Sequence, residues 1–281
     1  MGSRVEVNLA MKNTRTMRQF SFTFLLLTTL ACTHPAPEKA PSPFANGKWI
    51  DLTYAFDETT VYWPTAETFR LDTVFEGTTD SGFYYSAYQY CAAEHGGTHL
   101  DAPVHFAEGK LPMDQIPLEQ LIGEAVVVDV SAQAAANPDY QVTQADFEAW
   151  ERANGPLPKG VIVLLRTGFG KYWPDRAKYM GTAERGAAAV AKLHFPGLHP
   201  DAARWLVANR SIKSIGLDTP SIDYGQSTLF ESHRILFEKN VPAFENLANL
   251  DQLPPKGFWV FALPMKIKNG SGGPLRIVAG I

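Results

Sequence analysis

Cysteine is scarce in this 281-residue chain, which has only Cys32 and Cys91. Two cysteines cannot form a disulfide-stapled scaffold or a cysteine-rich zinc module. Basic residues are not in excess either: 25 Lys and Arg face 29 Asp and Glu, a formal net charge of −4 that gives no electrostatic footprint for nucleic acid. Glycine-rich phosphate loops of both common types are absent. With 45% apolar and 19% charged residues, the chain is instead typical of a globular enzyme or of a protein that binds a small molecule.

The longest apolar run, residues 20–31, is too short for a membrane span. It would extend about 18 Å as a helix, whereas the hydrocarbon core of a bilayer is about 30 Å thick. The preceding residues are basic on balance, and the run ends in Thr29-Leu30-Ala31-Cys32, which resembles the lipobox of bacterial lipoproteins. We therefore expect residues 1–31 to be a signal peptide of the lipoprotein type. The protein would then be exported to the periplasm or cell envelope and lipid-anchored at Cys32, with plain secretion as the alternative.

The rest of the chain predicts a short tether followed by one domain. Residues 32–47 are rich in proline, which is typical of an extended tether. Residues 48–281 show no internal repeat and no shift in composition, so we expect a single domain there, with no membrane contact other than the lipid anchor. Cys91 is the only thiol of that domain, and we expect it to be a small buried residue.

Short segments rich in β-branched residues alternate with helical patterns. We predict strands over residues 49–53, 125–130, 161–166, 212–217 and 258–263, and an aromatic strand over 83–90. One helix begins at a capping-box pattern near Thr143, a second begins at Pro200, and a third covers residues 229–239. Because the alternation has no clean βαβ repeat, the predicted fold class is a mixed α/β domain with a mixed sheet and covering helices.

The most informative segment is His95-Gly-Gly-Thr-His99-Leu-Asp101-Ala-Pro-Val-His105-Phe106. Glycines allow the backbone to fold tightly enough for these side chains to converge on one point. Imidazole and carboxylate groups together suit zinc, manganese or iron, and the absence of cysteine argues against a closed structural zinc site. The pattern therefore predicts a metal site. The alternative is a polar loop whose histidines cap or bond to the backbone.

This segment closely resembles the His-x-Gly-Thr-His-x-Asp-x-Pro-x-His-Phe signature of the cyclase family of metal-dependent hydrolases, which includes bacterial kynurenine formamidase and isatin hydrolase. The resemblance extends over about residues 48–281 through five further segments: 216–223, 232–236, 240–242, 245–247 and 272–276. It implies a swivelling β/β/α domain that forms a homodimer or a homotetramer.

The resemblance also implies a site for two metal ions. The ligands would be three histidines and two acidic residues: His95, His99, Asp101, His233 and Glu245. The first three would hold one ion, Asp101 would bridge to the second, His233 would bind the second, and Glu245 would contact both. Zn²⁺ is the expected ion and Mn²⁺ the alternative. Some relatives bind a single manganese ion, so the number of ions is open.

The same resemblance gives roles to two residues beside the metal site. His105 matches the catalytic acid/base of the family. Trp63, in Val-Tyr-Trp-Pro, lies where formamidases place an aromatic ring against the substrate, and the alternative is a packed core side chain. Asp218 and Asp223 either orient ligand imidazoles or form a turn. Two other histidines, His194 and His199, match no ligand position and are expected at a helix cap or at the surface.

Amide hydrolysis is slow because water is a poor nucleophile and because the tetrahedral intermediate carries an alkoxide. A metal ion helps with both, since it lowers the pKa of its bound water and polarises the carbonyl. A histidine near neutrality can then take a proton from water and return it to the leaving nitrogen. We therefore expect a hydrolase of an aryl or cyclic amide, with N-formyl-L-kynurenine as the first substrate in an arylformamidase reaction. The alternatives are an isatin-hydrolase-like ring-opening amidase or lactonase, and a lipid-anchored metal- or ligand-binding protein without turnover. Extra length around residues 132–158 and 172–196 is expected to form pocket walls or subunit contacts.

The lipid anchor can be tested by one substitution. Cys32→Ser should leave the domain folded but move the protein from the membrane pellet to the soluble fraction, because the acyl chains of a bacterial lipoprotein are what make such anchoring stable. Fractionation followed by immunoblotting measures the shift. A protein that is already soluble with Cys32 present would contradict the anchor.

Overall fold

The computed structural model describes residues 47–281. The predicted signal peptide, Cys32 and all but the last residue of the predicted tether lie outside the described residues. None of the helices within residues 47–281 has both the length and the apolar character that crossing a membrane requires.

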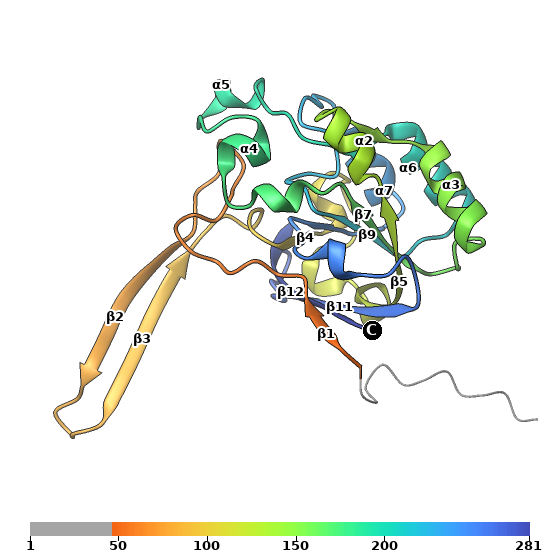
Figure 1. Ribbon diagram of the computed structural model, residues 1–281. Coiled ribbons are helices and arrows are strands. Elements are labelled where there is room, and N and C mark those ends of the chain that lie inside the picture. Colours follow the sequence, from red (N-terminus) through yellow and green to blue (C-terminus); the bar gives the residue numbers. More distant parts are fainter. Residues whose placement is uncertain (1–46) are drawn as a thin grey trace, which may run out of the picture. The chain divides into compact units, whose positions relative to one another are not determined.

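The centre of the fold is a mixed sheet that closes on itself (Figure 1). Its strands lie in the order β1-β12-β11-β5-β7-β9-β10-β4, and β4 also pairs with β12. The bounds are β1 (Trp49–Asp51), β4 (His99–Asp101), β5 (Ile122–Asp129), β7 (Ile162–Arg166), β9 (Ser214–Leu217), β10 (Ala243–Glu245), β11 (Phe258–Pro264) and β12 (Gly272–Gly280). The neighbours β5, β7, β9 and β10 run parallel, and the other pairs are antiparallel. One half of the long strand β12 pairs with β1 and the other half with β4, which makes the sheet barrel-like.

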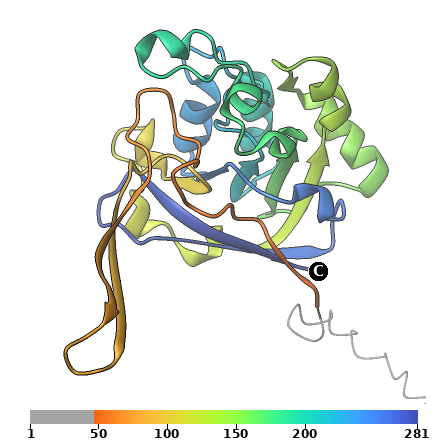
Figure 2. The same ribbon diagram turned by 60° about the vertical axis from the view of Figure 1, so that its left-hand side comes forward.

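Helices cover the parallel strands on their outer side (Figures 1 and 2). The α-helices are α1 (Leu118–Leu121), α2 (Ser131–Ala136), α3 (Gln144–Asn154), α4 (Arg176–Met180), α5 (Ala187–Val190), α6 (Pro200–Asn209) and α7 (Glu231–Phe237). Short 3₁₀ helices are η1 (Pro103–His105), η2 (Met113–Gln115), η3 (Phe169–Tyr172) and η4 (Leu250–Gln252). The predicted helix starts are confirmed: Thr143 and Asp146 form a capping box before α3, and Pro200 is the first residue of α6.

Apolar side chains are buried on both faces of the parallel strands. On β5, Val126 and Val128 belong to the cluster shared with Phe147 of α3 and Leu206 of α6. Val127, between them, belongs to a second cluster formed by the strands of the closed sheet. Alternate residues of a strand point to opposite faces, so burial on both faces requires a continuous apolar run. This requirement explains why the central strands could be predicted from short runs of β-branched residues.

The five strands predicted from β-branched residues are confirmed as β1, β5, β7, β9 and β11, and the aromatic strand as β3 (Tyr84–Cys91). The fold is thus a mixed α/β fold with a closed sheet and covering helices. Strand β3 pairs with β2 (Arg70–Thr78), and β6 (Gln141–Val142) pairs with β8 (Gly197–Leu198), outside the main sheet. The third helix is shorter than predicted, and Cys91 is exposed rather than buried. Cys91 ends a hairpin that stands away from the core, which is why the prediction for it is wrong (Figure 2).

Candidate active site

The predicted functional residues lie on neighbouring elements of the closed sheet. Strand β4 carries His99 and Asp101, which point to the same side because alternate residues of a strand do so. Strand β10 runs antiparallel to β4, and its Glu245 pairs with His99. Helix α7 adds His233, and the 3₁₀ helix η1, directly after β4, ends at His105.

A glycine turn before β4 adds His95. Gly97 has φ 58°, a left-handed conformation that favours glycine, and a Cβ there would lie 2.5 Å from the ring of Phe56. The turn brings His95 Nδ1 to 2.7 Å from Asp101 Oδ1. At Gly97, therefore, the glycine does what the sequence predicts, which is to let nearby side chains converge.

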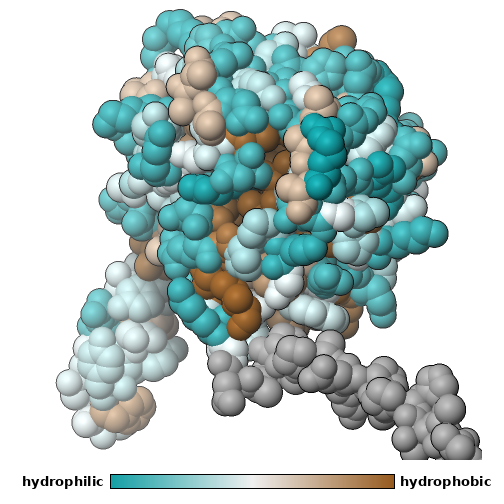
Figure 3. Space-filling view, turned by 45° about the vertical axis from the view of Figure 1, so that its right-hand side comes forward, coloured by the Kyte–Doolittle hydropathy of each residue, from teal (hydrophilic) through white to brown (hydrophobic). Residues whose placement is uncertain are grey.

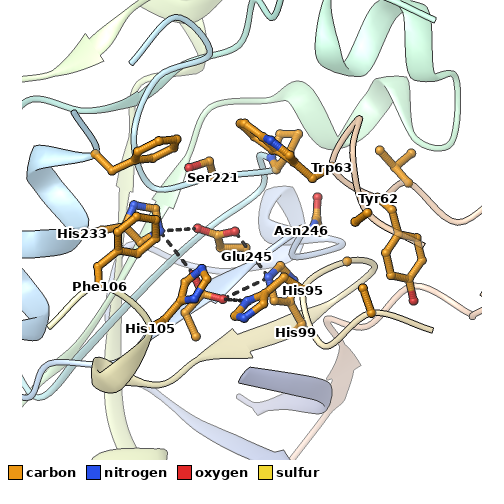
Figure 4. Close-up of a pocket in the computed structure, with 17 residues that line it drawn as sticks. Tyr62, Trp63, His95, His99, His105, Phe106, Ser221, His233, Glu245 and Asn246 are labelled. Atoms are coloured by element: carbon orange, nitrogen blue, oxygen red, sulfur yellow. Dashed lines mark hydrogen bonds and ion pairs between the residues drawn. The ribbon is translucent and has the colours of Figure 1, made fainter. Parts of the chain in front are cut away.

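Asp101 is at the centre of this cluster. Its Oδ1 lies 2.7 Å from His95 Nδ1 and 3.1 Å from His99 Nε2, and its Oδ2 lies 3.2 Å from His233 Nε2. Glu245 lies beside it, with Oε1 3.1 Å from His233 Nε2 and Oε2 3.5 Å from His99 Nε2 (Figure 4). Two groups of candidate ligands result, His95–His99–Asp101 and Asp101–His233–Glu245. The structure thus brings together all five predicted ligands, and Asp101 is the residue that both groups share.

Each of the three imidazoles turns its other nitrogen away from the cluster toward a hydrogen-bond acceptor. The donor–acceptor pairs are His99 Nδ1 to Gly97 O (2.9 Å), His233 Nδ1 to Asp223 Oδ2 (2.6 Å) and His95 Nε2 to Ser271 Oγ (3.0 Å). In the neutral ring the remaining nitrogen then directs its lone pair into the cluster. Imidazoles that bind metal ions are held in this way.

An unpaired nitrogen inside the cluster also fits a cation. His99 Nε2 is buried and, among residues 47–281, has no hydrogen-bond partner: Asp101 Oδ1 is 3.1 Å away but not in the direction of a bond. A buried polar atom without a partner is costly, and a cation between the two atoms would satisfy both. Three imidazoles and two carboxylates, without a thiolate, are donors that zinc and manganese accept. The cluster therefore fits one or two divalent ions.

Burial and charge shift the pKa values across the cluster. Burial opposes the charge of His99, but contact with Asp101 and the charge of Glu245 outweigh it and raise the pKa of His99 to about 9. Burial likewise opposes the charge of His233, but hydrogen bonds to Asp101, Asp223 and Glu245 raise its pKa well above the usual value. Burial and the charge of Asp101 also raise the pKa of Glu245. The buried histidines thus hold protons that a divalent ion would displace.

His105 differs from the five candidate ligands. It belongs to neither candidate ligand group, and its ring stacks on that of His95, with centroids 3.8 Å apart and planes 18° apart. Burial, together with the charges of His95 and His233, lowers the pKa of His105 to about 4, although Asp101 acts in the opposite direction. His105 is therefore neutral at pH 7 and free to accept a proton, but with this pKa it is a weaker base than the near-neutral histidine expected from the sequence.

The cluster borders a cavity of about 300 Å³ (Figure 4). Most of the remaining lining is apolar or aromatic and includes Val61, Tyr62, Trp63, Phe106, Pro220 and Phe230. Trp63 faces this cavity and also packs edge-on against Phe230, with ring centroids 6.3 Å apart, so its role against a substrate stays a prediction. The ionisable lining groups are those of the cluster, His105 and Tyr62, and no lysine or arginine of the described residues lines the cavity.

Known proteins are similar to this chain in sequence and in fold. Residues 50–224 match the family model described as "Putative cyclase". The chain belongs to this cyclase family. An isatin hydrolase of Roseibium aggregatum is 35% identical over 194 residues, which cover 66% of this chain and 71% of the relative. A kynurenine formamidase of Salinibacter ruber is 30% identical over 188 residues, 66% of this chain and 74% of the relative. The solved structure of isatin hydrolase A from Ralstonia solanacearum has a TM-score of 0.76 at 32% identity, over 88% of this chain and 98% of that one.

In this cyclase-family chain, two residues that orient His95 were not predicted. Ser271 Oγ donates its only proton to Glu94 Oε2 at 2.6 Å, so it must accept the hydrogen bond of His95 Nε2. The pair thereby fixes which nitrogen of His95 faces Asp101. Ser271 lies 176 residues from His95 along the chain, and no local pattern in the sequence connects them.

The structure gives different roles to Asp218 and Asp223, for each of which the sequence left two roles open. Asp223 accepts hydrogen bonds from the backbone and the ring of His233, so it orients a candidate ligand. Asp218 accepts bonds from the backbone of Thr167 and Gly168 and from the Thr167 hydroxyl, so it holds the loop after β7 instead.

The histidines expected outside the site lie outside it. His194 contacts Asp139 at 2.8 Å, and His199 caps α6 by accepting a hydrogen bond from the backbone of Asp201. Neither residue lines the cavity. The capping and surface roles expected from the sequence are therefore confirmed.

One of the two extra segments, residues 172–196, is connected to the cluster by hydrogen bonds. Tyr179 of α4, within residues 172–196, donates a hydrogen bond to Asn246 Oδ1 at 2.9 Å. Asn246 in turn donates to the Gly97 carbonyl at 2.7 Å, the same oxygen that accepts from His99. The segment thus reaches the ligand turn through a chain of hydrogen bonds.

The raised pKa of His99 predicts how the stability of the metal-free protein depends on pH. A group whose pKa rises from 6.5 to about 9 on folding stabilises the protein fully below about pH 6.5, and this contribution is lost as pH rises to about 9. The loss is on the order of 3 kcal/mol, so we expect the melting temperature in chelator to fall by roughly 5–10 °C over that interval.

Thermal melts at pH 6.5, 8 and 9, with chelator and with zinc, measure this dependence. Zinc should flatten the curve, because the ion takes the place of the protons. His105, with its lowered pKa, changes protonation only below pH 6.5 and does not contribute in this window. A metal-free protein whose melting temperature is constant from pH 6.5 to 9 would contradict the assignment.

Proposed function

We propose that the chain is a metal-dependent hydrolase that opens an uncharged cyclic amide fused to an aromatic ring, as in isatin. The cavity is the observation that carries this proposal. Its aromatic and apolar lining suits a flat ring, and no lysine or arginine of the described residues lines it to bind a charged substituent. Relatives named isatin hydrolase, at 35% and 32% identity, support the same substrate class.

The residues of the site divide the work of hydrolysis. A divalent ion, zinc first and manganese second, would polarise the amide carbonyl and lower the pKa of the attacking water when bound by the cluster. His105 is neutral at pH 7, so it accepts the proton that water loses on attack at the carbonyl carbon. It then returns this proton to the ring nitrogen as the C–N bond breaks. Trp63 and Phe230 hold the aromatic ring in place, which fixes the position of the carbonyl.

N-formyl-L-kynurenine, the first substrate expected from the sequence, is the second candidate. Relatives named kynurenine formamidase favour it, at 27–30% identity. Its amino-acid group carries both a carboxylate and an ammonium, however, and no lysine or arginine of the described residues lines the cavity to pair with the carboxylate. A binding protein without turnover would have no use for His105, which is why we place that alternative last.

The proposal predicts a substrate preference. The metal-loaded protein should have a kcat/KM for isatin at least about tenfold above that for N-formyl-L-kynurenine, since burying an unpaired charge in an apolar pocket costs more than 1.4 kcal/mol. Chelator should abolish both activities, and added zinc or manganese should restore them. A higher kcat/KM for N-formyl-L-kynurenine would overturn the ring-amide assignment, and no turnover of amides or lactones would favour the binding protein.

The role of His105 is tested separately from that of the ligands. His105→Ala should keep a metal content near that of the wild type but lower kcat by roughly 10²–10⁴-fold, the range for lost acid–base catalysis. Loss of a ligand, as in His233→Ala, should instead lower metal content and activity together. His194→Ala, outside the cavity, is the matched control and should change neither. Parallel loss of metal and activity in His105→Ala would make His105 a ligand and refute the proposed mechanism.

A further inference from the structure

Residues 61–67, the cavity loop, carry Trp63 and form part of the cavity wall. The loop contains no helix and no strand of a sheet, and the bridge between Tyr62 and Gly96 is an isolated one. After the loop the chain enters β2, which pairs only with β3 among the described strands, and Figure 3 shows this hairpin apart from the body. The hairpin therefore gives the loop no sheet contact that would hold it against the cavity. The loop residues that line the cavity are Val61, Tyr62, Trp63 and Ala66.

Arg176, the first residue of α4, holds the start of the cavity loop. Its Nη1 donates a hydrogen bond to the Tyr62 carbonyl at 2.6 Å, and its Nη2 donates to the Glu184 carbonyl at 3.4 Å. The guanidinium thus joins the loop to the extra segment of residues 172–196. Its Nε is buried without a hydrogen-bond partner among residues 47–281, and burial together with the charge of Arg185 lowers the pKa of Arg176. The two carbonyl oxygens are therefore the groups that stabilise this charge.

Two further residues of the extra segment hold the rest of the loop. Arg185 Nη2 donates a hydrogen bond to the Ala66 carbonyl. The backbone N–H of Gly186 donates to the Pro64 carbonyl at 2.8 Å. Alternate carbonyls of the cavity loop, at positions 62, 64 and 66, are thus bound by one short stretch of chain, residues 176–186.

Both arginines are directed at backbone carbonyls and not at carboxylates. Neither Arg176 nor Arg185 makes an ion pair within the described part of the chain. Hydrogen bonds from a charged donor are stronger than those between neutral groups, so two such bonds hold a loop firmly. The acidic residues beside the arginines pair with lysines instead: Asp175 with Lys178 at 2.7 Å, and Glu184 with Lys192 at 2.6 Å.

The same segment packs against the ring of Trp63. Phe195 meets this ring edge-on, with centroids 6.4 Å apart and planes at 78°. Val61, at the start of the loop, is buried in one cluster with Tyr179 and Phe195, and Trp63 packs against that cluster. No residue of the extra segment lines the cavity itself. Its influence on the cavity wall therefore acts through the cavity loop.

We propose that Arg176 and Arg185 are positioning residues that hold the cavity loop, and with it Trp63, against the cavity, and that the extra segment thereby determines how closely an aromatic ring fits there. The anchoring of the loop does not depend on any reaction. The fit of the ring rests on the proposed function, in which Trp63 holds the ring of the substrate. Arginine suits this task because its planar guanidinium donates in several fixed directions, whereas a lysine is a single point charge.

The anchoring is tested by hydrogen exchange of the zinc-loaded full chain, measured by mass spectrometry. Within the cavity loop, the Ala66 N–H donates to the Trp63 carbonyl at 3.1 Å, so its exchange reports opening of the loop. Arg176→Gln should speed exchange in the peptide of residues 61–67 roughly tenfold, because one hydrogen bond from a charged donor is lost. Arg185→Gln should change the exchange in the same direction.

Arg210→Gln is the matched control for the loss of a partly buried arginine. Arg210 pairs with Glu151 of α3 at 2.7 Å and makes no hydrogen bond to the cavity loop, so its substitution should leave exchange in the loop unchanged. The metal content of every variant should stay near that of the wild type, because the five candidate ligands lie outside the loop. Loop exchange that neither Arg176→Gln nor Arg185→Gln speeds up would overturn the anchoring.

The fit of the ring predicts a change in KM and not in kcat. Arg176→Gln should raise the KM for isatin about tenfold and leave kcat within about threefold, because the ring contact loosens while His105 and the metal cluster keep their places. Arg176→Lys, which keeps one of the two bonds, should have an intermediate KM. Millimolar methylguanidinium should lower the KM of Arg176→Ala, because it can occupy the place of the missing group. An unchanged KM, or a loss confined to kcat, would overturn the effect on fit.

Whether Arg176 acts through Trp63 is tested by combining substitutions. Trp63→Ala removes the ring that the loop presents and should raise KM at least as much as Arg176→Gln does. In that background, Arg176→Gln should raise KM by less than about twofold more, since residues that act through one another are not additive. A tenfold effect of Arg176→Gln both with and without Trp63 would show that the arginine does not act through this ring.

Failure of the anchoring and failure of the proposed function give different results. A wild-type chain that turns over no aromatic amide overturns the proposed function and the fit of the ring with it, whereas hydrogen exchange on the same protein still decides the anchoring. Isatin turnover by a chain whose loop exchange neither arginine variant changes would leave the proposed function standing and refute the anchoring.

Discussion

Two buried carboxylates, Asp101 and Glu245, impose the central constraint on this molecule. Ionised groups are not stable in a protein interior unless opposite charges and hydrogen-bond donors surround them. His99 and His233 each lie within 3.5 Å of both carboxylates, and these four side chains are at most 5% exposed. His233 comes from 132 residues beyond Asp101, so satisfying the carboxylates requires distant segments of the chain to meet. The fold holds these distant segments together around the two carboxylates.

The closed sheet supplies this means. β4 is only three residues long, yet it pairs with β10 on one edge and with β12 on the other. All three of its residues are buried, so the strand that carries His99 and Asp101 is held on every side. β10 adds Glu245 through the same pairing, and α7 packs its apolar side chains into the cluster beneath the parallel strands. Ligand geometry and sheet geometry are thus set by the same hydrogen bonds.

The sequence predicted the parts of this structure that depend on neighbours along the chain. The central strands have continuous apolar runs, α3 has its capping box, and the residues from His95 to Asp101 form a compact motif. Strand β12 was not predicted, because its glycines and proline hide the pattern, and because its partners β1 and β4 lie far from it along the chain. Ser271 could not be predicted for the same reason, since only the register of β12 against β4 places it beside His95.

The burial of a residue could not be predicted from the sequence where it depends on what its strand packs against. Cys91 was expected in the core because small apolar residues usually lie there, but β3 leaves the body and exposes it. The cavity wall likewise joins residues near Trp63, Phe106 and Phe230, which no single segment contains. That no lysine or arginine of the described residues lines the cavity is a property of the assembled wall and was visible only in three dimensions.

The unequal exposure of the candidate ligands has a consequence for how a metal ion would enter and leave the site. Four of them belong to elements of the packed core and are nearly inaccessible, whereas the side chain of His95 is 24% exposed and sits on the glycine turn before β4. An incoming ion would therefore meet His95 before the others, and a departing ion would leave it last. The four inner candidate ligands lie on β4, β10 and α7, which pack together in the core, so metal exchange should pass through the side where His95 lies, at a rate set by that turn and not by unfolding of the domain.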